Sequence, residues 1–255
     1  MNKNSTKLNN NANVLDQGLY VIATPIGNRQ DITLRALETM FGVDILLCED
    51  TRKTKLLLDY YRQNLITANV SSLLEISLER IPQLISYFEH NEDQRVPEVL
   101  SYLQKGLKVG LVSNSGTPTI SDPGYKLVKT CRESDIKVFS APGPSAIISA
   151  LSISGLSSDK FTFLGFLPRK PGKQNKIWKD IRNSSLGQTV IFYESPFRVF
   201  KTLANMEKCF GNIEVTIARE LTKKHEEVVT KPIIKWLEQK TFKGELVVLF
   251  RCSKE

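Results

Sequence analysis

The chain has 255 residues, of which 41% are hydrophobic and 24% are charged. These values are typical of a globular protein with a substantial core, and the length suits one large domain or two of ordinary size. No apolar run approaches the roughly 20 residues of a membrane helix. The N-terminus has no apolar stretch of the signal-peptide type. The composition therefore favours a cytoplasmic protein over a membrane or secreted one.

The positive charge is unevenly distributed along the chain. Residues 1–144 hold 16 Lys and Arg against 16 Asp and Glu, whereas residues 145–255 hold 19 against 11. The whole net charge of +8 thus lies in the second half. This asymmetry is expected if one half faces a polyanion, although positive charge also serves solubility.

The four cysteines are scattered, and no close-spaced pair suggests a zinc site. We expect buried, reduced thiols, as in a cytoplasmic protein. The two histidines, His90 and His225, are far apart in sequence. We therefore expect no metal.

Short β-rich runs alternate with amphipathic helical stretches after an Asn-rich segment, residues 1–16, that we expect to be a disordered tail. The first half predicts strands at 19–23, 43–49, within 82–90, at 108–113 and at 137–141. It predicts helices at 32–41 with Asp31 as N-cap, and at 51–61, 95–106 with Gly106 at its end, and 124–134. Residues 63–81 have a weaker pattern and stay unassigned. Such alternation argues for a parallel, doubly wound sheet.

The pattern restarts after Pro142-Gly143-Pro144. The second half predicts helices at 145–154, 173–183, 198–210 and 233–239. It predicts strands at 161–166, 188–194, 213–220 and 244–251. The sequence therefore predicts an α/β fold of two α/β domains, residues 17–141 and a basic domain of residues 142–255.

Three strand ends have unusual residues, and ligands of open α/β sheets bind beyond the carboxyl ends of strands. Residues 23–28, ATPIGN, stand where a dinucleotide loop would, but G-x-G-x-x-G is absent and a plain turn is the simpler interpretation. Residues 113–124, SNSGTPTISDPG, form a long connection of the kind that tends to be functional. Residues 141–146, APGPSA, predict a tight turn with Ser145 capping a helix whose amides suit a carboxylate.

A basic segment, residues 169–182, has six cationic residues and one acidic residue. Four of its lysines recur every three residues and predict a broad positive stripe on a helix. Such a run is often only a solvated helix face, but the charge asymmetry favours RNA contact. The candidate RNA-binding residues are Arg169, Lys170, Lys173, Lys176, Lys179 and, more weakly, Arg198. Trp178 and Trp236 are expected in the core rather than as stacking platforms.

Taken together, the motifs resemble the tetrapyrrole methylase family, the class III S-adenosylmethionine-dependent methyltransferases. They are most similar to its branch that 2′-O-methylates a cytidine of 16S, small-subunit, ribosomal RNA. The matching stretches run from about residue 19 to 227 and include LYVIATPIGNRQDITLRALE, CEDTRKTKLLL, SNSGTPTISDPGYKLV, PGPSAIISALSISGL, FLGFLPRKPGKQ, IFYESPFRVFKTL and ARELTKKHEE.

The resemblance implies two α/β domains with the S-adenosyl-L-methionine cofactor in the cleft between them, and a homodimer. It implies that the cofactor contacts Pro25, Gly27, Asn114, Ser115, Gly116, Thr117, Pro118, Ser145 and Ala146. The chain departs from the branch at Asn114, where an acidic residue is usual, so an ionic role there is lost although hydrogen bonding is kept. Residues 63–81 resemble an insertion.

A ribose hydroxyl is a weak nucleophile, so a general base would assist methyl transfer. The candidates are Glu49 and Asp50 at the end of the second strand, with Glu92 and Glu220 behind them. Arg52 is a candidate for orienting a phosphate or a carboxylate. Helix capping by Asp50 is an equally good interpretation of the same residues. Two other functions stay open: a small-molecule methyltransferase of the tetrapyrrole type, and a catalytically silent RNA-binding protein.

Overall fold

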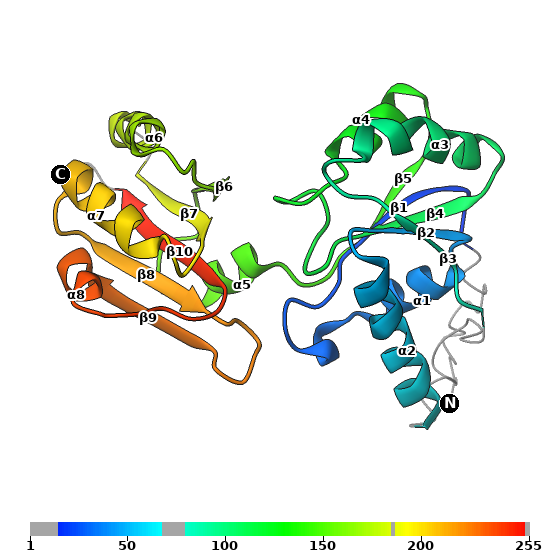
Figure 1. Cartoon of the computed structure of the whole chain (residues 1–255), viewed down its shortest axis with the longest axis horizontal. Coiled ribbons are helices and arrows are strands. Elements are labelled where there is room, and N and C mark those ends of the chain that lie inside the picture. Colours follow the sequence, from blue (N-terminus) through cyan, green and yellow to red (C-terminus); the bar gives the residue numbers. More distant parts are fainter. Residues whose placement is uncertain (1–14, 68–79, 185–186, 253–255) are drawn as a thin grey trace, which may run out of the picture. The chain divides into compact units, whose positions relative to one another are not determined.

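The structure, a computed structural model, describes residues 15–67, 80–184 and 187–252, and its contacts divide the chain into two units (Figure 1). The first unit contains the chain up to Thr24 together with Ile32–Gly143, and the second contains Pro25–Asp31 and Pro144–Glu255. The sequence predicted a division after residue 141 and left the short segment 25–31 in the first domain. The greater part of the predicted disordered tail, and most of the unassigned segment 63–81, lie outside the described residues.

The first unit is built on a five-stranded sheet in the order β3-β2-β4-β1-β5. All four strand pairings are parallel. The strands are β1 (Gly18–Ile22), β2 (Ile45–Cys48), β3 (Gln83–Ser86), β4 (Lys108–Val112) and β5 (Val138–Ala141). The helices are α1 (Leu34–Gly42), α2 (Thr51–Thr67), α3 (Glu92–Gln104) and α4 (Tyr125–Glu133).

Apolar side chains cover both faces of this sheet. On one face, α1 and α2 pack in a cluster that includes Met40, Leu58 and the strand residue Leu46. On the other face, α3 and α4 pack in a cluster that includes Leu103 and Leu111. Burial on both faces explains why the parallel strands are almost continuously apolar. The predicted doubly wound arrangement is confirmed for this unit.

Helix ends in the first unit follow local chemistry, with one correction. Gly106 follows α3 with a left-handed φ of 83°, as the sequence predicted for a helix-ending glycine. The prediction of Asp31 as N-cap of α1 was wrong, because the Thr33 side chain accepts the capping bond from Ala36 N at 3.1 Å. Asp31 belongs instead to the short helix η1 (Arg29–Asp31), and one of its carboxylate oxygens is buried without a hydrogen-bond partner among the described residues.

The second unit is built on a mixed sheet in the order β6-β7-β10-β8-β9. Its strands are β6 (Phe161–Phe166), β7 (Gln188–Glu194), β8 (Glu214–Arg219), β9 (Glu227–Pro232) and β10 (Leu246–Cys252). Its longer helices are α5 (Ala146–Ile153), α6 (Pro171–Asn183), α7 (Val199–Phe210) and α8 (Ile233–Leu237). Only β6 and β7 pair in parallel; β10 is antiparallel to both of its neighbours, and β8 is antiparallel to β9. The sequence did not predict the antiparallel pairings or the strand β9.

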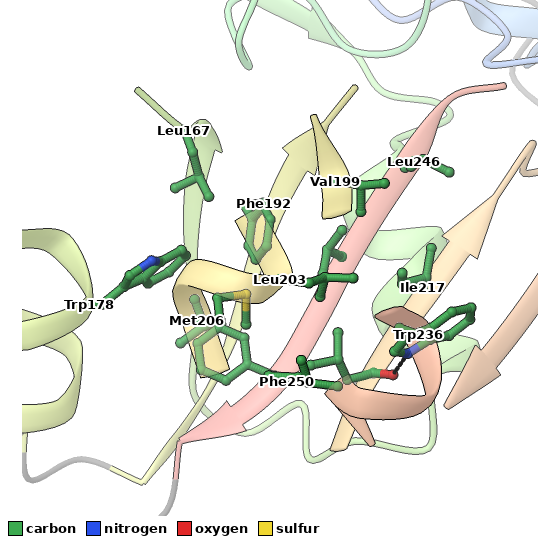
Figure 2. Close-up of a cluster of buried hydrophobic side chains, with 14 of the residues drawn as sticks. Leu167, Trp178, Phe192, Val199, Leu203, Met206, Ile217, Trp236, Leu246 and Phe250 are labelled. Carbon is green, nitrogen blue, oxygen red and sulfur yellow. Dashed lines mark hydrogen bonds between the residues drawn. The ribbon is translucent and has the colours of Figure 1, made fainter. Parts of the chain in front are cut away.

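A cluster of large apolar side chains holds α6, α7 and α8 against one face of this sheet (Figure 2). Trp178 is fully buried, and its ring lies 5.7 Å from that of Phe192. Trp236 is also buried and donates its indole N–H to Val215 O at 2.8 Å. The prediction of both tryptophans as core residues is confirmed. The opposite face is covered by α5 through Ile147 and its neighbours.

Two general features of the described residues complete the fold. No helix there combines the length and apolarity that crossing a membrane requires. The four cysteines are free thiols, and Cys48 and Cys131 are buried. Burial raises the pKa of each of these two thiols to about 11, so neither is a ready nucleophile.

Candidate active site

The carboxyl ends of the parallel strands meet along one edge of the first sheet. Thr24 follows β1, Glu49 follows β2, and Ser113 follows β4. Thr24 is buried and exchanges two backbone hydrogen bonds with Gly116, at 2.9 and 3.0 Å. The turn after β1 and the loop after β4 are therefore tied together at the edge where α/β sheets bind ligands.

The loop that follows β4, residues 113–124, is held in an unusual backbone conformation. Thr119 and Ser121 have left-handed φ values of 73° and 62°, which are uncommon for residues other than glycine. Gly124 closes the loop with a φ of 125°, and a Cβ there would lie 2.5 Å from Leu111 Cδ2. Its amide donates to the buried Glu92 at 2.6 Å. Strain of this kind persists only where the surroundings fix it, which supports a functional loop over a loose connection.

Two carboxylates and one amide meet where this loop leaves the sheet. Asn114 is exposed, and its backbone N–H donates to Glu49 Oε2 at 3.3 Å. Burial raises the pKa of Asp122 to about 6, with the nearby charge of Glu49 acting in the same direction and a hydrogen bond from Ser113 opposing it. Asp122 therefore changes its charge close to neutral pH, as a general base does.

The sequence did not single out Asp122, although it is the one acidic residue of the segment 113–124. Its position in a long polar loop was a usable signal. What the sequence lacked was the burial that shifts its pKa.

Asp50 and Arg52 form a capping arrangement at the start of α2. Asp50 accepts the Arg52 backbone N–H at 3.0 Å and its guanidinium at 3.0 and 3.1 Å. The Arg52 hydrogen bonds lower the pKa of Asp50 to about 2, which makes it a weak proton acceptor. Of the two interpretations open at the sequence level, the geometry favours the cap. The Arg52 side chain is 87% exposed.

The two reserve candidates for the base have internal partners. Glu92 is buried and accepts both Tyr87 OH and Gly124 N. Glu220 accepts the Glu245 amide and the Lys223 ammonium, both at 2.9 Å, and these bonds lower its pKa. Both carboxylates therefore hold the structure together rather than face a substrate.

The predicted cofactor residues Pro25 and Gly27 lie in the segment that packs on the second unit. A Cβ on Gly27 would lie 2.6 Å from Lys223 Cγ and 2.7 Å from Thr222 Oγ1. The next residue, Asn28, donates its backbone N–H to Thr222 Oγ1 at 2.9 Å. The protein's own turn at residues 221–223 therefore already requires a glycine at position 27.

Ser145 and Ala146 begin α5 in the same unit. Ser145 occupies the N-cap position, but its side chain makes no capping hydrogen bond, contrary to the predicted cap. Ile147 and Ile26 share one buried cluster, so the start of α5 and the segment 25–31 pack on the same face of the second sheet. First-turn amides without a side-chain cap are donors that suit an anionic group.

The predicted basic stripe lies on α6. The buried residues of this helix are Gln174, Trp178 and Ile181, which fall on one face. Three of the predicted RNA-binding residues lie on α6, Lys170 is its N-cap, and Arg169 precedes it. These residues are exposed, and none forms an ion pair with a residue that the structure describes; they are Arg169, Lys170, Lys173, Lys176 and Lys179. Lys173, Lys176 and Lys179 lie away from the buried face, because at 3.6 residues per turn these positions fall on the side of the helix opposite Gln174, Trp178 and Ile181.

Arg198, the sixth predicted RNA contact, has a different environment. Its guanidinium lies 3.3 Å from the fully buried carboxylate of Glu194 and donates to Leu167 O at 2.7 Å. A buried carboxylate needs such a partner. Arg198 therefore connects the ends of β6 and β7 and has less freedom to meet a phosphate than the lysines of α6.

The sequence is similar to a known protein family and to named proteins. The family described as Tetrapyrrole (Corrin/Porphyrin) Methylases matches residues 18–235. Proteins named ribosomal RNA small subunit methyltransferase I are 41% identical in Streptococcus pyogenes serotype M3 and 40% identical in Thermotoga maritima. Each alignment covers 91% of this chain, with 75% and 96% of the relative's length. The relative of that name from Vibrio cholerae is 42% identical, over 91% of this chain and 76% of its own.

Solved structures show the same fold at low identity. The methyltransferase CobJ superposes with a TM-score of 0.62 at 15% identity, over 92% of this chain and 94% of its own. Uroporphyrin III C-methyltransferase from Thermus thermophilus gives 0.58 at 12% identity, over 91% and 96%. Identity this low supports the fold alone, whereas the family match spans most of the chain. The chain belongs to the tetrapyrrole methylase family.

Proposed function

We propose that this protein transfers a methyl group from S-adenosylmethionine to the ribose 2′-oxygen of a cytidine in 16S ribosomal RNA of the small ribosomal subunit. The names of relatives at 40–42% identity support the substrate class. The observation that carries the proposal in this chain is the row of exposed lysines on α6, Lys173, Lys176 and Lys179, which have no ion-pair partner in the described part of the chain. A methylase of small tetrapyrroles has no use for such a row, whereas an RNA backbone neutralises it.

The start of α6 is unfavourable unless an anion binds there. Lys170 stands at the N-cap without a side-chain cap bond, and the first turn has no acidic residue. A cation at a helix N-terminus opposes the helix dipole and costs about 0.3–1 kcal/mol. Phosphate oxygens bound by Lys170, Arg169 and the Gly172 amide would remove this cost; Pro171 has no N–H, and the Lys173 and Gln174 amides donate to Lys170 O.

The loops at the strand ends have the donors and acceptors that S-adenosylmethionine requires. In the first unit, exposed Asn114 and Ser115 offer hydrogen-bonding groups beside the Glu49 carboxylate, and Gly116, Thr117 and Pro118 fix the loop behind them. In the second unit, Ser145 and Ala146 begin a helix whose first turn has no side-chain cap, which suits the methionine carboxylate. When bound, S-adenosylmethionine supplies an electrophilic methyl group whose departure leaves a neutral thioether.

The protein's own groups would position the ribose and accept its proton. As the 2′-oxygen forms its bond to the methyl carbon and the carbon–sulfur bond breaks, the hydroxyl proton passes to a base. Asp122, with a pKa of about 6, is the best-suited acceptor, with Glu49 beside it. Arg52 is exposed, and the guanidinium N–H groups that Asp50 does not accept can orient an RNA phosphate.

The proposal also covers the oligomeric state, the cellular compartment and the form of the RNA substrate. We expect a homodimer acting in the cytoplasm on small-subunit RNA or on assembled small subunits. Sedimentation equilibrium measures the dimer directly, and a monomer over the working concentration range would contradict that part alone.

A methyl-transfer assay tests the proposal. Unmodified small subunits are incubated with the protein and S-adenosylmethionine labelled in its methyl group, and the product is mapped to a nucleotide. Label on the 2′-oxygen of one cytidine is expected. Label on a tetrapyrrole but none on RNA would contradict the proposal and favour the small-molecule alternative. Absence of S-adenosylmethionine binding in calorimetry would favour the silent RNA-binding alternative.

A charge variant tests the role of α6. Replacing Lys173, Lys176 and Lys179 by Gln should weaken RNA binding and flatten its salt dependence, lowering the slope of log K against log salt by about 2. The matched control replaces Lys105, Lys129 and Lys137 of the first unit, three exposed lysines with the same total charge. Equal effects of the two triple variants would show that only net charge matters.

A further inference from the structure

Two aromatic rings lie exposed at the carboxyl ends of neighbouring parallel strands in the second unit. Phe197 is 96% exposed, the highest value for a large hydrophobic side chain among the described residues, and it follows β7 by three positions. Phe166 is 59% exposed and is the last residue of β6. Single exposed apolar residues are ordinary. Two aromatic rings at the same edge, where ligands of such sheets bind, require a reason.

The chain around Phe197 is held in place by a buried ion pair. Glu194 is buried, and its carboxylate accepts the Ser195 amide at 2.8 Å and pairs with Arg198 at 3.3 Å. Arg198 also donates to Leu167 O at 2.7 Å. The residues beside Phe197 and Phe166 are thus tied to each other. A ring presented on a fixed turn loses little conformational entropy when a partner stacks on it.

The surroundings of these rings identify the kind of partner. Phe166 packs on Tyr193 with ring centroids 5.3 Å apart. Arg169 and Lys170, three and four positions after Phe166, are exposed and lead into the cationic helix α6. Aromatic rings next to unpaired cations are the combination that binds unpaired nucleotides, with bases on the rings and phosphates on the cations. A duplex already stacks its own bases and gains little from the rings.

We infer that Phe197 and Phe166 form a stacking surface for unpaired bases of the RNA, beside the phosphate-binding start of α6. The inference rests on the proposed function, since it names how the same substrate is held. The stacking surface would make this face of the protein prefer single-stranded or splayed RNA, whereas the cations alone would bind any polyanion.

A second copy of the chain is the other partner that an exposed aromatic patch commonly meets. A two-fold interface through this face would bring the same cationic patch, which includes Arg169 and Lys170, together from both copies. Like charges placed opposite each other disfavour that pairing. Charge complementarity therefore favours a polyanion at this face.

Phe197→Ala tests the inference in the full-length protein. Binding of a fluorescein-labelled single-stranded RNA and of the same sequence as a duplex is measured by fluorescence anisotropy at fixed salt. Phe197→Ala should weaken single-strand binding by about 5- to 150-fold, and duplex binding far less. Phe197→Trp should keep single-strand affinity. Because the stacked base carries no charge, the salt slope should be unchanged.

The matched control is Phe161→Ala, which removes a 42% exposed ring from the opposite end of β6 and should leave RNA affinity unchanged. Unchanged single-strand affinity of Phe197→Ala would overturn the inference, and a simultaneous change in its sedimentation would assign the ring to a second copy of the chain. The methyl-transfer assay separates the two levels. If Phe197→Ala weakens RNA binding but the wild-type protein methylates no RNA, the stacking surface is supported and only the proposed function is contradicted.

Discussion

Replacing Asp122 by Asn should remove a pH dependence from the stability of the first unit. Burial raises the pKa of Asp122 from 3.8 to about 6, so between these values the folded protein keeps a proton that the unfolded chain has released. The native state then binds more protons than the unfolded state, and the free energy of unfolding falls as the pH rises through this window. Asn has no proton to release, so the variant should lack this fall.

The magnitude follows from the size of the shift. A shift of two units corresponds to roughly 3 kcal/mol at full effect. The carboxyl is only partly buried and solvent screens it, so about 1–2 kcal/mol is the realistic expectation. Relative to the wild type, Asp122→Asn should therefore gain about 1–2 kcal/mol between pH 4 and pH 7.

Urea unfolding followed by two signals measures this difference. Circular dichroism reports both units, whereas fluorescence reports only the second, because both tryptophans, Trp178 and Trp236, lie there. The change should appear in the dichroism transition and leave the fluorescence transition in place. Asp50→Asn is the control, because Arg52 lowers the pKa of Asp50 from 3.8 to about 2. The stability that the ionised Asp50 contributes is lost only as the pH falls from about 3.8 to about 2, which is below the pH range of this test. If the free energies of unfolding of Asp122→Asn and the wild type change equally from pH 4 to pH 7, the assigned burial of this carboxyl is wrong.

Two further substitutions test how local contacts fix the candidate site. Gly27→Ala should destabilise the packing of segment 25–31 by about 1–3 kcal/mol, because the new Cβ would lie 2.9 Å from Leu221 O. Limited proteolysis should then cut this segment faster. The control is Gly172→Ala, whose Cβ would meet nothing within 4 Å and which should leave the cleavage pattern unchanged. Thr33→Ala should destabilise α1 by about 1 kcal/mol through loss of its cap; an equal loss in Asp31→Ala, measured by urea unfolding, would contradict the assignment of the cap to Thr33.

The elements of the fold were predictable where local pattern and burial agree. The strands at 161–166 and 188–194 have the predicted bounds, because each is an apolar run between turn-forming residues. β9 was missed because Glu227–Pro232 is polar at its start, ends in Pro and lies at the sheet edge, where apolar alternation is weak. The antiparallel position of β10 is set by long-range pairing, which local periodicity does not encode.

The candidate site was predictable at the level of loops and less so at the level of atoms. The loop at 113–124 was recognised from its length and composition, and it does lie at the carboxyl edge of the sheet. The docking of residues 25–31 on the second unit rests on long-range contacts: the burial of Ile26 beside Ile147, and a hydrogen bond between Asn28 and Thr222, which are 194 positions apart. The roles of Asp122 and Arg198 likewise depend on burial and pairing that arise only in the folded chain.

The charge asymmetry that the sequence shows between its two halves is the same when it is counted for the two structural units. Moving residues 25–31 into the second unit transfers one cation, Arg29, and one anion, Asp31, so the second unit keeps the whole +8 and the first remains neutral. Long-range attraction of a polyanion therefore acts on the second unit, while the carboxylates Glu49 and Asp122 lie in the neutral first unit. A proton-accepting group works best when its pKa stays near the working pH. Because the charges of the first unit balance, burial and the charge of Glu49 raise the pKa of Asp122 without an excess of that unit's own cations to oppose them.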